Sequence, residues 1–202
     1  MKILIATKNP GKVREFREIL SADGVEWDDL SAHPQLLSPE ETGRTFRANA
    51  CLKARYFATA AGAWAVADDS GLEVDAIGGN PGVHSARWAQ INGFGKGDTD
   101  NNRLLLRQLD PIPDPQRTAR FVCVLALADP HGRIILTARD TVEGMIIREE
   151  RGTNGFGYDP LFYFPDRGRT TAELSSDEKH RISHRGKALR KLRQLMQTHC
   201  GT

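Results

Sequence analysis

The spacing of hydrophobic residues near the start of the chain predicts two short strands with a helix between them. Residues 2–6 and 25–27 are the apolar runs that read as strands. The helix is expected from Pro10 to about Leu20, with Asn9 as its cap, because proline at the first helical position lacks only an N–H that has no partner there. Its inner face is expected to carry Val13, Phe16, Ile19 and Leu20.

The next segments alternate between turn-rich and apolar stretches. Residues 31–43 contain Pro34, Pro39 and Gly43 and predict a loop, whereas the alanine-rich residues 45–61 predict a helix. A short apolar strand, residues 64–67, is expected to end directly before Asp68-Asp69-Ser70-Gly71. Residues 78–82 are too rich in glycine and proline for a regular element.

The second half of the chain predicts a helix, a hairpin, a loop and a last helix. Asp98 or Thr99 is expected to cap a helix that runs through Leu109. The later elements are a hairpin of strands 119–128 and 133–142 around the turn 129–132, a glycine-rich loop at 152–157 and a helix at 183–197. Strands mixed with helices, together with a hairpin, predict an α/β fold with a mixed sheet.

Length and composition favour one globular domain over residues 1–202. The chain is 39% hydrophobic and 27% charged, and the one proline-rich stretch, residues 110–116, is the expected connector between two lobes. No apolar run approaches the ~20 residues that a membrane-spanning helix needs, and the apolar start of the chain is too short for a signal peptide. The cysteines Cys51, Cys123 and Cys200 are scattered, which argues against a disulfide framework or a zinc site and for a cytoplasmic protein.

The charge balance does not imply a nucleic-acid-binding field over the whole protein, but the charge is locally uneven. A net charge of +2 is nearly neutral. Basic residues without any acid gather at 179–193, while acids gather at Glu40-Glu41 and between Asp68 and Asp75. Should these regions meet in space, carboxylates and cations would face each other, an arrangement that suits a metal-bound polyphosphate.

A first candidate phosphate site is the turn between the first strand and the first helix. A helix N-terminus offers unpaired N–H groups and the positive end of the helix dipole. The turn adds neutral donors, two lysines and a glycine that lets a ligand approach the backbone: Thr7, Lys8, Asn9, Pro10, Gly11 and Lys12. It does not match the Walker A pattern. The alternative is a capped helix with solvated lysines.

A second candidate site is Asp68-Asp69-Ser70-Gly71. Adjacent strand residues point to opposite faces, so only one of the two carboxylates faces a given cleft. Magnesium takes one or two carboxylates and fills its other positions with water and phosphate oxygens. Glu40, in the loop before the second helix, is the candidate for the other carboxylate. The alternative is ordinary turn chemistry.

Two further motifs could bind a purine base. In Gly155-Phe156-Gly157-Tyr158-Asp159-Pro160, two aromatic rings separated by glycine could enclose a planar base, or they could anchor the loop to the core. In Ser183-His184-Arg185-Gly186, the two basic side chains could donate to the oxygen at C6 of a purine, whereas adenine presents an amino group there. The alternative is a basic, solvated helix.

Taken together, these motifs resemble the inosine/xanthosine triphosphate pyrophosphatase family. The resemblance runs in order from residue 3 to about residue 190. Its motifs are Ala6–Lys12, Glu40–Gly43, Asn49–Ala54, Ala67–Leu72, Pro81–Arg87, Gly155–Pro160 and Ser183–Gly186. Residues 90–100 and 129–140 resemble the family weakly.

The resemblance implies an elongated α/β fold with two lobes around a central nucleotide-binding cleft, usually in a homodimer. It implies that residues 7–12 wrap the triphosphate, that Asp69 is the catalytic carboxylate and contacts Mg²⁺, and that Glu40 completes the metal site. The nucleotide would be held by Lys53, Ser70, Phe156, Gly157, Tyr158, Asp159, Lys179, His184 and Arg185.

The expected reaction converts a nucleoside triphosphate such as dITP, ITP or XTP and water into the monophosphate and pyrophosphate. Asp69 would activate the water that attacks the α-phosphorus, with Mg²⁺ on the phosphate oxygens. Lys8, Lys12 and Lys53 would offset the negative charge of the substrate. Two alternatives are a phosphotransferase that uses the same triphosphate site and a non-enzymatic RNA-binding or nucleotide-sensing module. The expected partner is thus a small molecule, with no membrane and no nucleic acid.

Overall fold

The computed structural model describes residues 2–20 and 25–200, apart from the side chains of residues 199 and 200. They form two compact units. Unit 1 takes the described residues up to 69, residues 123–140 and those from 184 onward, and unit 2 takes residues 70–122 and 141–183. The number of units agrees with the two lobes expected. The proline-rich connector expected at 110–116 lies inside unit 2, because the chain changes units within long elements instead of at a flexible linker.

A seven-stranded mixed sheet has the order β2-β1-β3-β4-β5-β6-β7. The strands are β1 Lys2–Ile5, β2 Glu26–Asp29, β3 Trp64–Val74, β4 Thr118–Ala128, β5 Ile134–Ile146, β6 Phe162–Phe164 and β7 Arg169–Thr170. β1 pairs in parallel with β2 and β3, whereas β6 pairs antiparallel with β5 and β7. The prediction of an α/β fold with a mixed sheet is therefore confirmed.

β3 is longer than the sequence pattern indicated. We expected a strand at 64–67 followed by a loop, but the strand continues through Asp68 and Asp69 to Val74. Leu72 and Val74 are fully buried in the core of unit 2, so extended backbone beyond the acidic pair gains hydrophobic burial. The acidic pair thus lies within a strand and not after its end.

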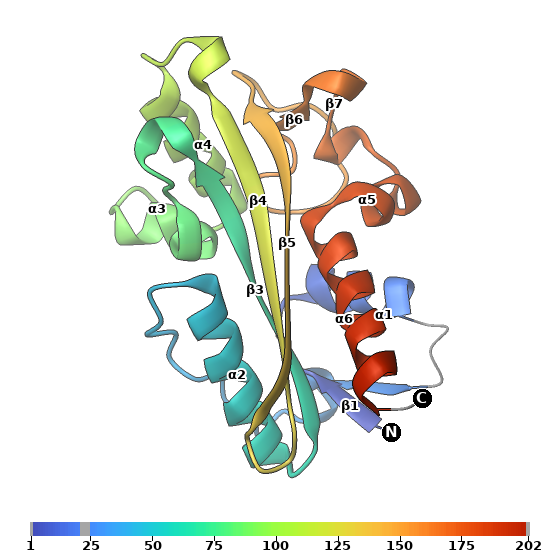
Figure 1. The fold of residues 1–202 in the computed structure, drawn as a ribbon. Coiled ribbons are helices and arrows are strands. Elements are labelled where there is room, and N and C mark those ends of the chain that lie inside the picture. The colour runs from blue at the N-terminus through green and yellow to red at the C-terminus, as the bar shows by residue number, and fades with distance from the viewer. Residues whose placement is uncertain (1, 21–24, 201–202) are drawn as a thin grey trace. The chain divides into compact units, whose positions relative to one another are not determined.

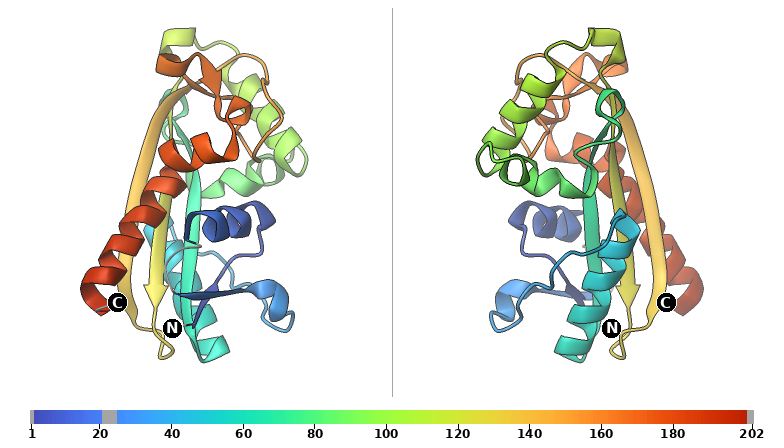
Figure 2. Two further views of the ribbon diagram at one scale, coloured as in Figure 1. Left: turned by 90° about the vertical axis from the view of Figure 1, so that its right-hand side faces the viewer. Right: turned by 90° about the vertical axis from the view of Figure 1, so that its left-hand side faces the viewer.

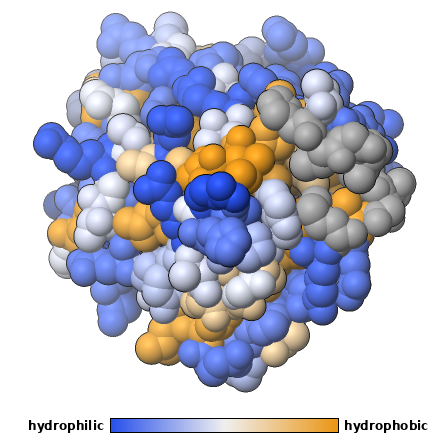
Figure 3. All heavy atoms as spheres, turned by 60° about the horizontal axis from the view of Figure 1, so that its bottom comes forward, coloured by the Kyte–Doolittle hydropathy of each residue, from blue (hydrophilic) through white to orange (hydrophobic). Residues whose placement is uncertain are grey.

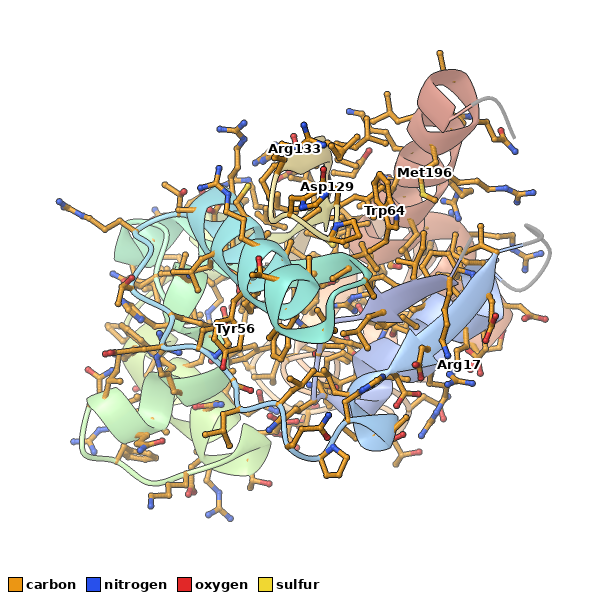
Figure 4. The ribbon with its side chains drawn as sticks, turned by 90° about the horizontal axis from the view of Figure 1, so that it is seen from below. Arg17, Tyr56, Trp64, Asp129, Arg133 and Met196 are labelled. Atoms are coloured by element: carbon orange, nitrogen blue, oxygen red, sulfur yellow. The ribbon has the colours of Figure 1, made fainter. Side chains whose placement is uncertain are left out.

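In unit 1, helices pack against the strands of the sheet that belong to this unit (Figure 1). Its helices are α1 Pro10–Leu20, α2 Phe46–Ala61 and α6 His184–Cys200. Phe16 and Leu20 of α1 pack with Leu189 and Leu192 of α6 in one core cluster, which confirms the inner face predicted for α1. Figure 4 shows Met196 of α6 next to Trp64 of β3 at one end of this core.

The turn between β4 and β5 is held by one carboxylate. Asp129 accepts hydrogen bonds from the backbone N–H groups of His131 and Arg133, at 3.0 and 2.9 Å, and from the Arg133 guanidinium at 2.7 Å (Figure 4). This closes the predicted hairpin. Around this end of unit 1, hydrophilic residues form most of the surface and apolar ones emerge between them (Figure 3).

Unit 2 has helices α3 Trp88–Ile91, α4 Asp98–Leu109 and α5 Ser176–Ile182 (Figure 2). Its core joins Leu105 and Leu109 of α4 with Phe121 of β4 and Phe162 of β6. The buried Arg117 donates to the carbonyl oxygens of Leu109 and Ile112, at 2.6 and 3.2 Å, and thereby holds the proline-rich turn against the end of α4.

Some element boundaries differ from the predictions. The residue before α4 is Gly97, and neither Asp98 nor Thr99 caps the helix. The sequence analysis missed α5, which is too short for a hydrophobic repeat. Its signal is the capping box of Ser175 and Glu178, in which each side chain accepts from the backbone N–H of the other residue. Among the described residues, no helix is long and apolar enough to span a membrane.

Candidate active site

The turn before α1 is closed by hydrogen bonds from backbone N–H groups to its own side chains. Asn9 accepts a hydrogen bond from the backbone N–H of Lys12 at 3.1 Å, so the predicted cap is confirmed. Thr7 in turn accepts from the N–H of Asn9 at 3.2 Å. Lys8, Asn9 and Pro10 are exposed, while Thr7, Gly11 and Lys12 are half-buried. An exposed helix N-terminus that carries a lysine is a position where an anion is favoured.

Asp68 and Asp69 face different partners, as the alternation of a strand predicts. The Asp68 carboxylate accepts from the Lys12 ammonium and, at 2.8 Å, from Nε of Arg185. The Asp69 carboxylate accepts from Nζ of Lys53 at 2.6 Å and from the amide of Asn49 at 3.3 Å. The strand therefore places one carboxylate beside the phosphate loop and the other beside α2.

Burial raises the pKa of Asp69 above its ordinary value, although the neighbouring Lys53 favours the carboxylate. At Lys53 the neighbouring charges, and not burial, decide the direction of the pKa shift. Burial disfavours its charged form, but the carboxylates of Asp69 and Glu41 outweigh burial and raise the pKa of the ammonium. Glu41 accepts from Lys53 at 2.8 Å, so the lysine bridges two carboxylates. A carboxylate whose pKa is raised is a stronger proton acceptor than an ordinary aspartate.

Asn49 is fixed by a close approach of the backbone at Gly43. The Asn49 side-chain oxygen accepts from the N–H of Gly43 at 2.8 Å, which orients its amide nitrogen toward Asp69. A Cβ at position 43 would lie 2.4 Å from the Asn49 oxygen. This contact explains why a glycine follows the acidic pair at 40 and 41.

Asp68 and Arg185 form a fully buried ion pair. Burial would raise the pKa of Asp68, but Arg185 and Lys12 hold it well below its usual range. The Arg185 guanidinium also donates from one Nη to Glu15 of α1 at 2.6 Å. The pKa of Arg185 lies well above its ordinary value, because the two carboxylates outweigh burial. The Cys123 thiol donates to Asp68 at 3.3 Å, and burial raises the pKa of that thiol.

These side chains form a chain of alternating charge within unit 1. Its order is Glu15, Arg185, Asp68, Lys12, Asp69, Lys53 and Glu41. Ion pairs make every link except that between Lys12 and Asp69, where the charge of Lys12 acts on the carboxylate electrostatically. Three cations face four carboxylates, which leaves a formal charge of −1. We call this set the charge chain. Through Lys12 it is continuous with the turn at the start of α1.

The carboxylates of the charge chain fit a metal that is held mainly by water and phosphate. Asp69 and Glu41 meet at Lys53, whereas Glu40 is exposed. No group of three or more acidic, histidine or cysteine side chains among the described residues could hold a metal by itself. One or two carboxylates with water and substrate oxygens are the ordinary ligand set of Mg²⁺. The assignment of Glu40 to the metal stays a prediction, and Glu41 is the alternative that the geometry offers.

The glycine-rich aromatic loop belongs to unit 2 and uses its two rings differently. Tyr158 is buried in the core, and its hydroxyl donates to the carbonyl oxygen of Ser85 at 2.9 Å. Phe156 is half-buried, with the Lys179 ammonium 4.8 Å from its ring centroid. Tyr158 therefore anchors the loop, which leaves Phe156 as the candidate for contact with a base.

Asp159 holds the rest of this loop. Its carboxylate accepts from the backbone N–H of Phe156 at 2.9 Å and from the buried Lys179 at 2.7 Å. A Cβ on Gly155 would lie 2.0 Å from the same carboxylate. Asp159 thus connects the loop to Lys179 and holds the backbone at Phe156.

The remaining predicted residues are placed as follows. Ser70 follows Asp69 in β3 and is half-buried. His184 is buried as the first residue of α6, and Arg185 is the second. Arg185 was expected to read the base, but the structure directs at least two of its nitrogens to Asp68 and Glu15. Its role in base selection stays a prediction.

Sequence reasoning missed Glu15, Glu41, Asn49 and Cys123 as members of the site. The available signals were weak: Glu15 is an acid among the apolar residues of α1, and Asn49 interrupts the alanine-rich start of α2. A polar residue on a buried helix face needs a partner. The sequence did not reveal those partners, since they lie in distant segments.

Comparison with known proteins identifies the chain. It is 51% identical to a dITP/XTP pyrophosphatase of Exiguobacterium sibiricum, with 100% of both chains covered, and 52% identical to one of Geobacillus kaustophilus, with 95% of this chain and 92% of the relative covered. A solved Ham1 protein of Coxiella burnetii has a TM-score of 0.87 at 40% identity. The match covers 98% of this chain and 99% of the Coxiella chain. A nucleoside-triphosphatase / dITP/XTP pyrophosphatase of Mycobacterium abscessus has a TM-score of 0.73 at 46% identity, with 95% and 98% covered. The model of the Ham1 family matches residues 3–195, and the chain belongs to this family.

Proposed function

We propose that this protein hydrolyses non-standard purine nucleoside triphosphates, namely dITP, ITP and XTP, to the monophosphate and pyrophosphate, and so removes deaminated purines from the nucleotide pool. Relatives that match the whole chain at about half identity carry the name dITP/XTP pyrophosphatase. The observation that carries the proposal is the geometry of Asp69, a buried carboxylate held by Nζ of Lys53 at 2.6 Å and the amide of Asn49 at 3.3 Å.

In the proposed reaction Asp69 takes the proton of a water molecule. The water oxygen forms a bond to the α-phosphorus as the bond between that phosphorus and the bridging oxygen to the β-phosphorus breaks. Pyrophosphate leaves and the proton stays on the carboxylate until it passes to solvent. Asn49 and Lys53 hold the carboxylate in one orientation, so that only the protonation state has to change.

The cations of unit 1 would bind the polyphosphate. Lys12 lies at the N-terminal turn of α1, and the exposed Lys8 adds a second charge there. Asp69 with Glu41 or Glu40 would hold Mg²⁺. A bound Mg²⁺ would supply charge neutralisation for the phosphate oxygens and the leaving group. With that divalent ion, the formal charge of −1 of the charge chain becomes positive, which favours a polyphosphate.

The base would be bound by Phe156 through stacking, with Lys179 and His184 as donors to purine oxygens. Gly157, Tyr158 and Asp159 would shape the loop, and Ser70 would contact the nucleotide beside Asp69. For Arg185 we propose a donor to the C6 oxygen in addition to its buried ion pairs. A homodimer and a cytoplasmic location are proposed along with this function.

A substrate panel tests the proposal. Purified protein is incubated with ITP, XTP, dITP, GTP and ATP in Mg²⁺, and the products are separated. We expect pyrophosphate and monophosphate from the first three and slow turnover of the last two. Orthophosphate release or phosphate transfer would support a phosphotransferase, and binding without turnover would support a nucleotide-sensing module.

A further inference from the structure

Two side chains of α4 bind the backbone of the aromatic loop from both sides of one residue. The Asp98 carboxylate accepts from the N–H of Gly157 at 2.7 Å. The Asn102 amide donates to the carbonyl oxygen of the same Gly157 at 3.2 Å. Residues four apart lie on one face of a helix, so the two side chains reach the same residue together. We call Asp98 and Asn102 the α4 clamp.

The α4 clamp acts at a glycine whose backbone is in the left-handed conformation. Gly157 has a φ of +63°, and nothing lies within 4 Å of the position that a Cβ would take. Without a side chain of its own to pack, Gly157 is tied to α4 through its backbone N–H and its carbonyl oxygen. On either side of it lie Phe156, the candidate for base contact, and Tyr158, which is anchored in the core.

The clamp is itself supported on the side of Asn102. This side chain is 3% exposed, and its amide also donates to Glu150 at 2.9 Å. Asp98 is exposed on the first turn of α4, where its negative charge interacts favourably with the positive end of the helix dipole. A stabilising acid at this place needs no hydrogen bond to another segment. Its contact with Gly157 is therefore additional to its role in the helix.

We propose that Asp98 and Asn102 are positioning residues that set the ring of Phe156 for the purine base and so determine base affinity and selectivity. The proposal rests on the function proposed above, since it needs the loop to contact the base. It also gives a role to residues 98–102, a segment to which neither the motifs nor the names of the relatives assign one.

The test compares Asp98→Ala with Asp100→Ala. Asp100 also lies in the first turn of α4, but its carboxylate accepts from the backbone N–H of Lys96 at 2.9 Å. Both variants lose one acid from the helix start, and only Asp98→Ala loses a bond to the loop. We expect Asp98→Ala to raise KM for ITP about tenfold with kcat changed less than twofold, the pattern of lost binding energy. It should also lower the ratio of kcat/KM for ITP to that for ATP.

Three further variants complete the test. Asp98→Asn keeps an acceptor oxygen and should restore KM to near the wild-type value, which a purely electrostatic role in the helix would not do. Asn102→Ala should raise KM as Asp98→Ala does. Phe156→Ala reports on the loop itself and should raise KM at least as much.

Each result decides something. If Phe156→Ala raises KM but Asp98→Ala behaves like Asp100→Ala, the α4 clamp is refuted and the proposed function stands. A fall in kcat at unchanged KM in Asp98→Ala refutes the clamp as well. If Phe156→Ala leaves KM and selectivity unchanged, the loop does not bind the base, and both the clamp and that part of the proposed function are wrong.

Discussion

Unit 1 and unit 2 both hold candidate site residues, but they fix them by different means. In unit 1, charged side chains hold one another in the charge chain, and each ion pair depends on the next. In unit 2, the aromatic loop is held by the buried side chain of Tyr158 and by hydrogen bonds to its backbone, from Asp98 and Asn102 at Gly157 and from Asp159 at Phe156. Ion pairs redistribute when a charged ligand arrives, whereas backbone hydrogen bonds keep one geometry. The first arrangement suits a polyphosphate and the second a flat, uncharged base.

The largest loss of activity is expected from a substitution in unit 1, at Asp69. Asp69→Asn keeps the shape of the side chain but removes its negative charge, so it can no longer accept the proton of water. We expect kcat to fall by about 10²- to 10⁴-fold, the contribution of a general base, with the thermal unfolding midpoint nearly unchanged. Retention of more than about a tenth of the wild-type kcat, an increase of the activation free energy of less than ~1.4 kcal/mol, would exclude Asp69 as the general base.

Removal of divalent cations should lower turnover almost as strongly, because the proposed metal ligands lie in unit 1. After exhaustive EDTA treatment we expect at least about a hundredfold loss of turnover, because a metal at phosphate oxygens contributes several kcal/mol of charge stabilisation. Added Mg²⁺ should restore it. Binding of a nucleoside without phosphates, followed by fluorescence or calorimetry, should change little. Full turnover in EDTA would contradict the metal assignment.

Gly43→Ala tests whether the orientation of Asp69 depends on Asn49. The new Cβ would meet the Asn49 oxygen at 2.4 Å and push the amide away from the carboxylate. We expect about a tenfold loss of kcat, the cost of roughly one hydrogen bond to a charged group. In an Asn49→Ala background the same change should cost less kcat, since coupled residues are not additive. The contacts of the new Cβ with Ala48 Cβ and the backbone N of residue 49, both at 2.9 Å, remain in either background. Equal losses in both backgrounds would mean that Gly43 acts elsewhere.

The smallest effect is expected at Gly157, where space is available but the backbone is left-handed. Gly157→Ala should destabilise the fold by about 1–2 kcal/mol through strain alone. Gly78→Ala is the matched control, because Gly78 has a φ of +66° and equally open surroundings. Urea denaturation should give similar losses for both variants, while only Gly157→Ala should raise KM for ITP. A rise in KM in both would remove the distinction between the loop and the rest of unit 2.

Local signals predicted much of the fold and part of the site. Asn9 before Pro10 predicted the start of α1, and the alternation of strand residues predicted that Asp68 and Asp69 face different partners. Both depend only on neighbours in the chain. The end of β3 was predicted wrongly, because Asp-Asp-Ser-Gly has turn-forming residues, whereas sheet pairing and the burial of Leu72 and Val74 beyond it favour extended backbone.

The sequence by itself determined which residues carry charge, where the helices and most strands begin, and the family resemblance through motifs in register. Only the tertiary structure decided how those charges are paired. Arg185 meets Asp68 across 117 positions of the chain and Glu15 across 170, and Gly157 meets Asp98 across 59. Periodicity and capping patterns act over a few residues, whereas an ion pair forms wherever packing brings opposite charges together, and no local pattern contains that information.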